Sequence, residues 1–191
     1  MKIRHAAKSD AAPWLDLRHA LWPHASKDEH HSDIQKFLAG VAREPQAVLV
    51  AEDDSGLLVG FAELSIRAYA EGCSTDRVAF LEGWYVSPTS RRRGIARLLI
   101  AAAEQWASRN GCVEFASDAH VDNEVSAVAH RSCGFSEVVV VRCWGAIHYI
   151  AVFQMLNTET TPSVRFAPPR FPTRRSQAKG GFGKTGHWGG P

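Results

Sequence analysis

The sequence predicts a mixed α/β sandwich, in which the elements follow one another in the order β-α-α-β-β-β-α-β-α-β-β. Two patterns predict this class: short apolar runs bounded by turn residues, typical of strands, alternate with longer segments whose apolar residues recur at helical spacing. Length is the third observation, because 191 residues with 45% hydrophobic content can bury one sizeable core.

The chain opens with a short strand and a capped helix. Residues 1–6 are expected to form the strand. Ser9 and Asp10 are typical N-cap residues and Pro13 suits a first helical turn, so a helix follows. Trp22-Pro23 ends it, because a residue before proline disfavours the helical region.

A loop, a helix and a hairpin come next. We expect polar residues 24–33 to form a loop and residues 34–41 a second helix. Residues 47–51 form an apolar run, residues 53–56 (Asp-Asp-Ser-Gly) are turn-forming, and residues 57–66 return as a strand.

The central block predicts a strand, a loop and a long helix. Residues 78–86 are expected to be a strand, residues 87–93 a loop, and residues 95–108 a helix with clear periodicity. A short strand over 114–117 and a helix over 123–133 follow.

The end of the chain divides into two parts. Residues 136–144 and 147–156 are expected to be closing strands, so the predicted domain spans 1–156. Residues 157–191 contain 5 Pro and 6 Gly, with six Lys/Arg against one acid, Glu159. Because such a segment buries too little surface to offset its ordering entropy, we expect a disordered basic tail.

Composition excludes several classes. Six Trp, 9 Phe and 3 Tyr argue against a wholly disordered chain. No apolar run reaches the roughly 18 residues that span a bilayer, and the first residues lack a secretory signal. The four cysteines have no C-x-x-C spacing and the histidines no metal-ligand spacing, so we expect no metal and a cytoplasmic location.

A basic, glycine-containing loop stands between the strand 78–86 and the helix 95–108. Backbone N–H groups at a helix start bind anions, and Gly94 permits close approach of a pyrophosphate. Arginines add charge-assisted contacts. The loop and first helical turn contain Arg91, Arg92, Arg93, Gly94, Ile95, Ala96 and Arg97.

This loop resembles the acetyl-CoA motif Q/R-x-x-G-x-G/A of the GCN5-related N-acetyltransferase (GNAT) superfamily. Asn123, His130 and Gly134-Phe135 stand where that family has a helix-start Asn, a Tyr and a Gly-Phe pair. The resemblance covers about residues 1–145. It implies a mostly antiparallel sheet whose central strands splay apart to admit acetyl-CoA.

Within that superfamily the chain resembles the aminoglycoside 6'-N-acetyltransferases. The shared segments are Trp22-Pro23, 60–67 with Tyr69 and Gly72-Cys73, Phe80-Leu81-Glu82-Gly83, and Ala116-Ser117-Asp118 with Asn123. The resemblance implies acetyl transfer from acetyl-CoA to the 6'-amine of a cationic aminoglycoside, with antibiotic resistance as the outcome. It also implies a homodimer.

Glu82 and Asp118 are the expected acceptor-binding and catalytic carboxylates. Glu82 stands in an otherwise apolar strand, where a carboxylate faces solvent, forms an ion pair or is held in a cleft for its chemistry. The resemblance makes both residues ligands of the substrate amines and candidate general bases. Asp118 has the alternative role of a helix cap.

The resemblance assigns the remaining site residues. Trp22 and Tyr69 would be aromatic walls for the substrate, although Trp22 could instead anchor the core. His130 would protonate the departing thiolate in place of the family's Tyr, or simply pack on its helix. Acidic residues around Asp28 to Asp33 would add substrate contacts. Backbone groups of Trp84, Tyr85 and Val86, together with Asn123, would hold acetyl-CoA.

Two rival functions stay open. The same fold could acetylate a polyamine or a protein amine. A non-catalytic acetyl-CoA sensor, or a nucleic-acid tether using the basic tail, is the rival from another class, although Arg and Phe there are few and not repeated.

Overall fold

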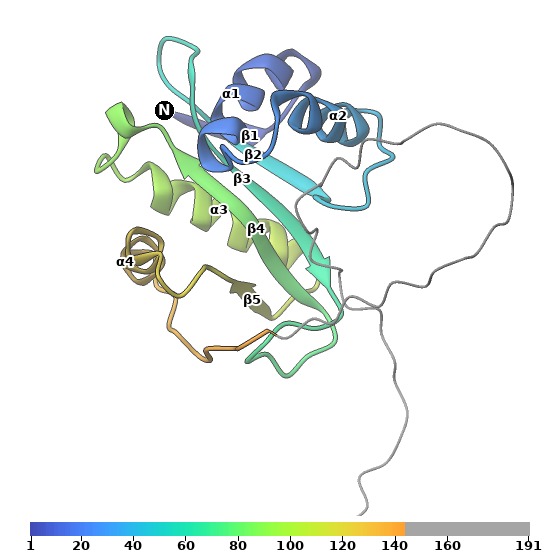
Figure 1. Cartoon of the computed structure of the whole chain (residues 1–191), viewed down its shortest axis with the longest axis vertical. Helices are drawn as coiled ribbons and strands as arrows, with labels where there is room; N and C mark the ends of the chain where they lie inside the picture. Colours follow the sequence, from blue (N-terminus) through green and yellow to red (C-terminus); the bar gives the residue numbers. More distant parts are fainter. Residues whose placement is uncertain (144–191) are drawn as a thin grey trace, which may run out of the picture. The chain divides into compact units, whose positions relative to one another are not determined.

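A computed structural model describes residues 1–143, which form a five-stranded sheet flanked by helices (Figure 1). The strand order is β1-β2-β3-β4-β5; the first four strands pair antiparallel, and β5 lies parallel to β4. The predicted mixed α/β class is therefore confirmed. The strands are β1 Lys2–His5, β2 Ala47–Glu52, β3 Leu58–Arg67, β4 Val78–Val86 and β5 Glu114–Ser117.

The helices agree with the periodicity of the sequence, with one exception described below. Helix α1 ends at Leu21 with Trp22 as its C-cap, as the Trp22-Pro23 pair predicts. One 3-10 turn, Lys8–Asp10, precedes α1, and a second, Pro88–Ser90, lies in the loop between β4 and α3. The helices are α1 Ala11–Leu21, α2 Lys27–Leu38, α3 Ile95–Arg109 and α4 Glu124–Ser132.

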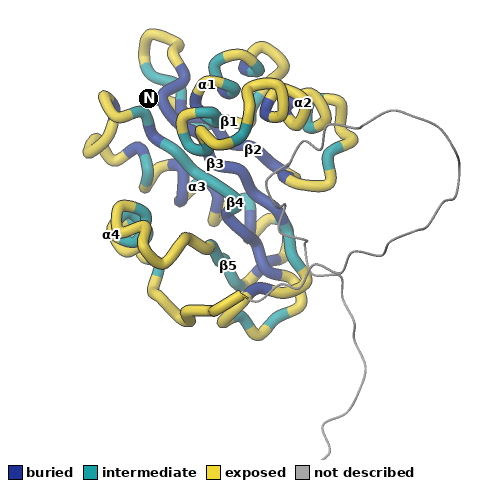
Figure 2. Tube along the Cα trace, viewed as in Figure 1, coloured by how far each residue is buried: buried dark blue, intermediate teal, exposed yellow. Residues whose placement is uncertain are grey.

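Alternating residues of the central strands build two cores, one on each face of the sheet. Val48 and Val50 of β2 pack in a cluster with Trp14 of α1 and Ile34 of α2. Their neighbours Leu49 and Ala51 pack in a second cluster that contains Leu99, Ile100 and Ala103 of α3. The strands are accordingly buried, whereas the outer surfaces of α2 and α4 are exposed (Figure 2). Two-sided burial explains why β2 is a continuous apolar run.

Helix α2 begins seven residues earlier than the sequence analysis predicts. The predicted loop over residues 24–33 is therefore wrong from Lys27 onward. Ser26 caps the helix: its hydroxyl accepts from the Glu29 backbone N–H (3.2 Å), and Glu29 accepts from the Ser26 N–H (3.0 Å). This is a capping box. Only His30 and Ile34 are buried along α2, so its polar first turns lack an apolar stripe that would reveal them.

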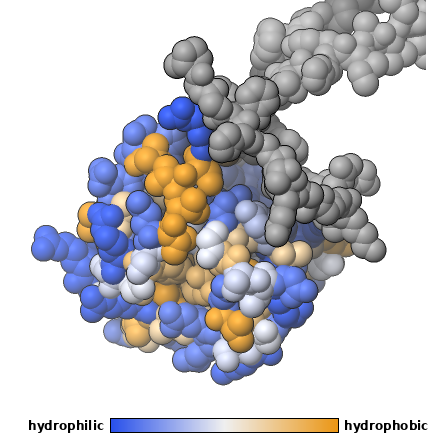
Figure 3. Space-filling view, turned by 90° about the horizontal axis from the view of Figure 1, so that it is seen from below, coloured by the Kyte–Doolittle hydropathy of each residue, from blue (hydrophilic) through white to orange (hydrophobic). Residues whose placement is uncertain are grey.

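The predicted strand over residues 136–144 is wrong for its described part, since residues 136–143 form no helix or strand. Four consecutive valines in this segment are exposed by 47 to 69%. An apolar run becomes a strand only where a neighbouring strand pairs with it, and the described residues supply none here. Hydrophobic side chains gather in a surface patch on the face seen from below (Figure 3). The exposed valines of this segment are Val138, Val139, Val140 and Val141.

The other expectations for the end of the chain lie outside the described residues. These are the strand over 147–156, the domain boundary at residue 156 and the disordered tail 157–191. Within the described residues no helix is long and apolar enough to cross a membrane.

A carboxylate on β5 fastens the loop between β3 and β4. Glu114 accepts hydrogen bonds from the backbone N–H groups of Ser74 (3.0 Å) and Thr75 (2.7 Å) and from both hydroxyls. These bonds favour the ionised form and lower the pKa of the Glu114 carboxyl to about 2. The loop that carries Tyr69 is thereby tied to the first residue of β5.

We expect Glu114→Gln to destabilise the fold most at neutral pH. Because the folded-state pKa lies below the ordinary value of 4.5, the charge contributes stability above that value, and this contribution is lost as pH falls toward 2. Urea unfolding between pH 7 and pH 3 should show that the difference in free energy of unfolding between wild type and variant becomes smaller as the pH falls. A difference that stays constant with pH would show that the Glu114 charge does not cause the destabilisation.

Candidate acetyl-transfer cleft

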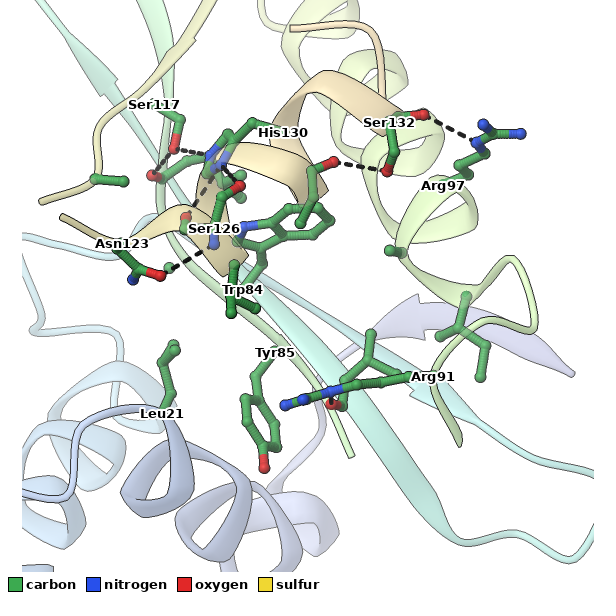
Figure 4. A pocket seen from close by; sticks show the side chains of 18 of the residues that line it. Leu21, Trp84, Tyr85, Arg91, Arg97, Ser117, Asn123, Ser126, His130 and Ser132 are labelled. Carbon is green, nitrogen blue, oxygen red and sulfur yellow. Dashed lines mark hydrogen bonds between the residues drawn. The ribbon is translucent and has the colours of Figure 1, made fainter. Parts of the chain in front are cut away.

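The two parallel strands of the sheet separate and open a cleft. Strands β4 and β5 pair only from Val78↔Glu114 to Leu81↔Ser117, and β4 continues to Val86 with no partner among the described residues on that side. The splayed central strands expected from the resemblance are therefore present. A cleft of about 810 Å³ lies here, lined by the ends of α1 and β4, the loop before α3, the start of α3, and α4 (Figure 4).

Most of the predicted site residues line this cleft, although they come from five separate segments. Tyr69 and Arg93 are not among the lining residues. Tyr69 lies on the β3–β4 loop with 56% of its surface exposed, and its role stays a prediction. The predicted residues that line the cleft are Trp22, Glu82, Trp84, Tyr85, Val86, Arg91, Arg92, Gly94, Ile95, Ala96, Arg97, Asp118, Asn123 and His130.

Glu82 stands at a β-bulge, on the sheet face that α1 covers. Glu63 pairs with Gly83 and the next residue, Leu64, pairs with Leu81, so Glu82 is the extra residue of β4. A bulge of this kind reverses the alternation of side chains that follow it. Gly83 accordingly faces α1, while Trp84 joins the cluster on the α3 side.

Glu82 is held in a two-point ion pair. Its Oε1 accepts from Arg67 Nε (3.0 Å) and its Oε2 from Arg67 Nη2 (2.5 Å), while Ser65 Oγ also donates to Oε1. The Arg67 guanidinium in turn stacks on Phe80, with its Cζ 3.4 Å from the ring centroid. Glu82 keeps 18% of its side chain exposed and faces the cleft. Glu82 therefore forms an ion pair and also lines the cleft, while its chemical role stays a prediction.

Asp118 and Asn123 follow β5 on the opposite side of the cleft. Asn123 caps α4, because its Oδ1 accepts from the Ser126 backbone N–H at 3.0 Å. The alternative role of Asp118 as a helix cap is thereby excluded. Asp118 is exposed directly after the last residue of β5. The cleft is thus lined by two carboxylates, those of Glu82 and Asp118, and by arginines of the loop before α3 and its first turn.

Trp22 forms the wall of the cleft beside Glu82. A Cβ added to Gly83 would lie 2.4 Å from the Trp22 ring, so the indole covers that glycine closely. His30 Nε2 donates to the Trp22 carbonyl at 3.0 Å, which fixes the residue that ends α1. Trp22 thus contacts the core and borders the cleft. By contrast, Asp28 and Asp33 belong to α2 rather than to a loop and do not line the cleft, so their substrate contacts stay a prediction.

The loop before α3 has the backbone of an anion-binding turn. Gly94 is the N-cap of α3 at φ +79°, with no side-chain cap bond. Arg92 also has a positive φ of 61°, an uncommon conformation for a residue with a side chain. The first-turn N–H groups of α3 therefore have no capping side chain and face the cleft beside Ala96. This arrangement fits the pyrophosphate of acetyl-CoA.

Two arginine side chains in this region position the backbone. Arg91 Nε donates to the Val86 carbonyl at 3.0 Å and lies near the Tyr85 ring (Figure 4). Arg97 Nε donates to the Ser132 carbonyl at 3.0 Å and so joins α3 to the end of α4. Both side chains thus bind main-chain carbonyls, and the expectation that the backbone supplies most of the pyrophosphate contacts stays a prediction.

His130 points at the strand junction through a hydroxyl. Its Nδ1 lies 2.8 Å from the Ser126 carbonyl, which can only accept, so Nδ1 carries a proton. Its Nε2 lies 3.0 Å from Ser117 Oγ (Figure 4). The imidazole ring also packs edge-on against Trp84, with the two ring centroids 5.4 Å apart. His130 therefore packs on its helix and, at the same time, contacts a hydroxyl that lines the cleft.

Sequence reasoning missed three groups at this site: Arg67, Ser117 and Glu63. Arg67 and Ser117 stand inside the shared segments but carry no signal of their own. Glu63 was detectable as a second carboxylate in an apolar strand, the same signal that singles out Glu82. Among the described residues no cluster of His, Cys, Asp or Glu could hold a metal ion.

Sequence comparisons identify the family. Residues 14–135 match the acetyltransferase (GNAT) family. The chain is 50% identical over 142 residues to aminoglycoside N(6')-acetyltransferase type 1 of Klebsiella aerogenes, covering 74% of this chain and 93% of that protein. It is 40% identical over 136 residues to the protein of the same name from Stenotrophomonas maltophilia, covering 71% and 86%.

Solved structures give the same result. The apo crystal structure of aminoglycoside 6'-N-acetyltransferase AAC(6')-IG from Acinetobacter haemolyticus is 39% identical, with a TM-score of 0.71, and the match covers 77% of this chain and 99% of that one. AAC(6')-Iy in complex with the bisubstrate analogue CoA-S-monomethyl-acetylneamine is 38% identical, with a TM-score of 0.70 and coverage of 76% and 97%. Together with the splayed strands, these matches show that the chain belongs to the acetyltransferase (GNAT) family, alongside the aminoglycoside N(6')-acetyltransferases.

Proposed function

We propose that this protein transfers the acetyl group of acetyl-CoA to the 6'-amine of aminoglycoside antibiotics. The observation that carries the proposal is the cleft itself, which joins a phosphate-binding helix start to two carboxylates, Glu82 and Asp118. The relatives named for this activity, matched over more than 70% of the chain, support the substrate class.

The acyl donor would occupy the side of the cleft formed by β4 and α3. Acetyl-CoA supplies an activated thioester. The unpaired edge of β4 from Trp84 to Val86 offers backbone groups to the pantetheine arm and acetyl group. A backbone N–H near Val86 would stabilise the negative charge that develops on the thioester oxygen. The first turn of α3 after Gly94 would bind the pyrophosphate.

The acceptor would occupy the side formed by Trp22, Glu82 and Asp118. Its ammonium groups are attracted by the two carboxylates, and its sugar rings pack on the indole. Glu82 takes the proton of the reacting amine, directly or through a water that it orients, and the neutral amine then attacks the thioester. No cysteine lines the described cleft, so the proposal contains no acyl-enzyme step.

His130 is the proposed proton donor to the departing thiolate. The donor form is the imidazolium, which carries a proton on Nε2 as well as on Nδ1. Because Nε2 is hydrogen-bonded to Ser117, its proton would pass to the Ser117 oxygen while the Ser117 hydroxyl proton passes to the thiolate, which leaves His130 neutral. Acetylation would remove one positive charge from the drug and so confer resistance.

The four thiols, all free, support a cytoplasmic location. The four consecutive exposed valines over 138–141 support a homodimer, which size-exclusion chromatography with light scattering would test.

Thiol release from acetyl-CoA tests the proposal with kanamycin, tobramycin and spermidine supplied separately. We expect turnover with both aminoglycosides and none with spermidine. Turnover with spermidine alone would move the function to polyamine acetylation. Binding of acetyl-CoA without turnover of any acceptor would favour the sensor hypothesis. RNA binding that weakens steeply with salt and requires residues 157–191 would favour the tether.

A further inference from the structure

A second, smaller pocket adjoins the cleft behind Trp22 and Glu82. It measures about 210 Å³ and is lined by Arg18, Trp22, Glu44, Pro45, Glu63 and Glu82. Trp22 and Glu82 also line the main cleft, so these two side chains border both spaces. A water molecule occupies about 30 Å³ of liquid, which leaves room here for an amine and the carbon atoms that carry it.

Three carboxylates face this pocket against one guanidinium. Arg18 is itself engaged: its Nε donates to Glu63 at 2.9 Å, and its Nη1 lies 3.5 Å from Asp33. Glu82 is paired with Arg67. Glu44, on the loop before β2, is exposed. The charges that line the pocket therefore favour a cation.

Glu63 is the buried member of this set and has unused bonding capacity. It is 1% exposed, and both of its hydrogen bonds, from Trp14 Nε1 (3.1 Å) and Arg18 Nε (2.9 Å), go to the same oxygen, Oε1. Its Oε2 has no partner among the described residues, although the side chain borders the pocket. Burial raises the pKa of this carboxyl to about 7. Because buried polar atoms are normally hydrogen-bonded, Glu63 Oε2 is an acceptor at the pocket wall that lacks a donor.

We propose that this pocket binds a second ammonium group of the acceptor, with Glu63 Oε2 as its buried ligand. The Trp22 ring, shared with the cleft, adds an apolar wall; the Arg18 guanidinium carbon lies 5.2 Å from its centroid. The inference rests on the proposed function, because the reacting amine must lie in the cleft at Glu82 while the second amine reaches past it. Glu63 would thereby determine which polycations bind in the orientation that presents the amine to be acetylated.

The test combines one protein change with single-amine changes in the ligand. Calorimetry on the full-length protein with CoA would measure the Kd of neamine and of three analogues, each with the amine at position 1, 3 or 2' replaced by hydroxyl. Glu63→Gln keeps an oxygen for Trp14 and Arg18 but removes the charge. We expect this variant to raise the Kd of neamine about tenfold, as for a hydrogen bond to a charged group. For one analogue, the one that lacks the amine bound by Glu63, the Kd should be the same in wild type and variant.

Controls separate charge, folding and function. Glu104→Gln removes an exposed carboxylate of α3 outside both pockets and should leave every Kd unchanged. Glu44→Gln, at an exposed position, should repeat the pattern of Glu63→Gln with a smaller factor, and serves in its place if Glu63→Gln is unfolded in urea titrations. A loss that is equal for all four ligands, or absent, overturns the subsite. If Glu63→Gln weakened the binding of neamine but not of one analogue, and yet the protein transferred no acetyl group, the proposed function would be refuted and the subsite would stand.

Discussion

Glu82→Gln is expected to lower kcat with aminoglycosides by about 10²-fold or more, while the KM for acetyl-CoA stays within about threefold. The amide can accept hydrogen bonds but cannot take the proton of the reacting amine, and loss of a general base lowers rates by about 10² to 10⁴. Glu82 lies on the acceptor side of β4, away from the helix start that would hold the donor. Steady-state kinetics with each substrate varied separately would measure both constants.

Glu52→Gln is the matched control for this change. Glu52 on β2 also pairs with an arginine, Arg4, at 2.6 Å and is similarly shielded, with 26% of its side chain exposed. It lies outside both pockets. We expect this variant to lose stability and keep kcat. Asp118→Asn should behave like Glu82→Gln, since Asp118 also faces the acceptor side. Equal losses of kcat and acetyl-CoA affinity in the two cleft variants would contradict their assignment to acceptor chemistry.

Gly94→Val should weaken acetyl-CoA binding about tenfold or more. Gly94 has a φ of +79°, and a left-handed conformation costs a residue with a side chain about 1–2 kcal/mol. A tenfold change in affinity corresponds to about 1.4 kcal/mol. Valine would either pull the N-cap out of this conformation or place its branches over the N–H groups of α3. Fluorescence or calorimetric titration with CoA measures the loss.

Gly56→Val separates this effect from general strain. Gly56, in the β2–β3 turn, has a φ of +85°, and as at Gly94 nothing lies within 4 Å of an added Cβ. Both variants should lose similar stability in urea, whereas Gly94→Val alone should lose CoA affinity. If Gly56→Val weakened CoA binding to the same degree, the loop before α3 would not be the specific anion site.

Local patterns in the sequence were sufficient to predict most of the described elements. The periodicity of residues 95–108, the Trp22-Pro23 stop and the β2–β3 hairpin all depend on neighbours within a few residues, and the structure confirms them. The start of α2 was missed although the Ser26–Glu29 capping box is also local, because a polar helix has no apolar stripe. The error over 136–143 has a different origin, since strand formation requires a partner.

The phosphate-binding loop could likewise be predicted, because its strand, glycine and helix follow one another along the chain. On the acceptor side the resemblance pointed to Trp22, Glu82 and Asp118, which line the cleft. The contacts of Glu82 could not be predicted, because this side is assembled from β3, β4 and α1. The bulge that places Glu82 beside Gly83 is a property of the pairing between β3 and β4. The ion pair of Glu82 with Arg67 joins residues 15 apart, and Glu63 meets Arg18 across 45 residues.

The sequence by itself determined the family, the order of the elements from β1 to α4 and the glycine-containing loop before α3, since these depend on residue type and short-range spacing. The tertiary structure alone decided which carboxylate faces the cleft, which is paired and which retains a free oxygen. Those properties depend on burial and on contacts between distant segments, because desolvation and hydrogen bonding act through space rather than along the chain.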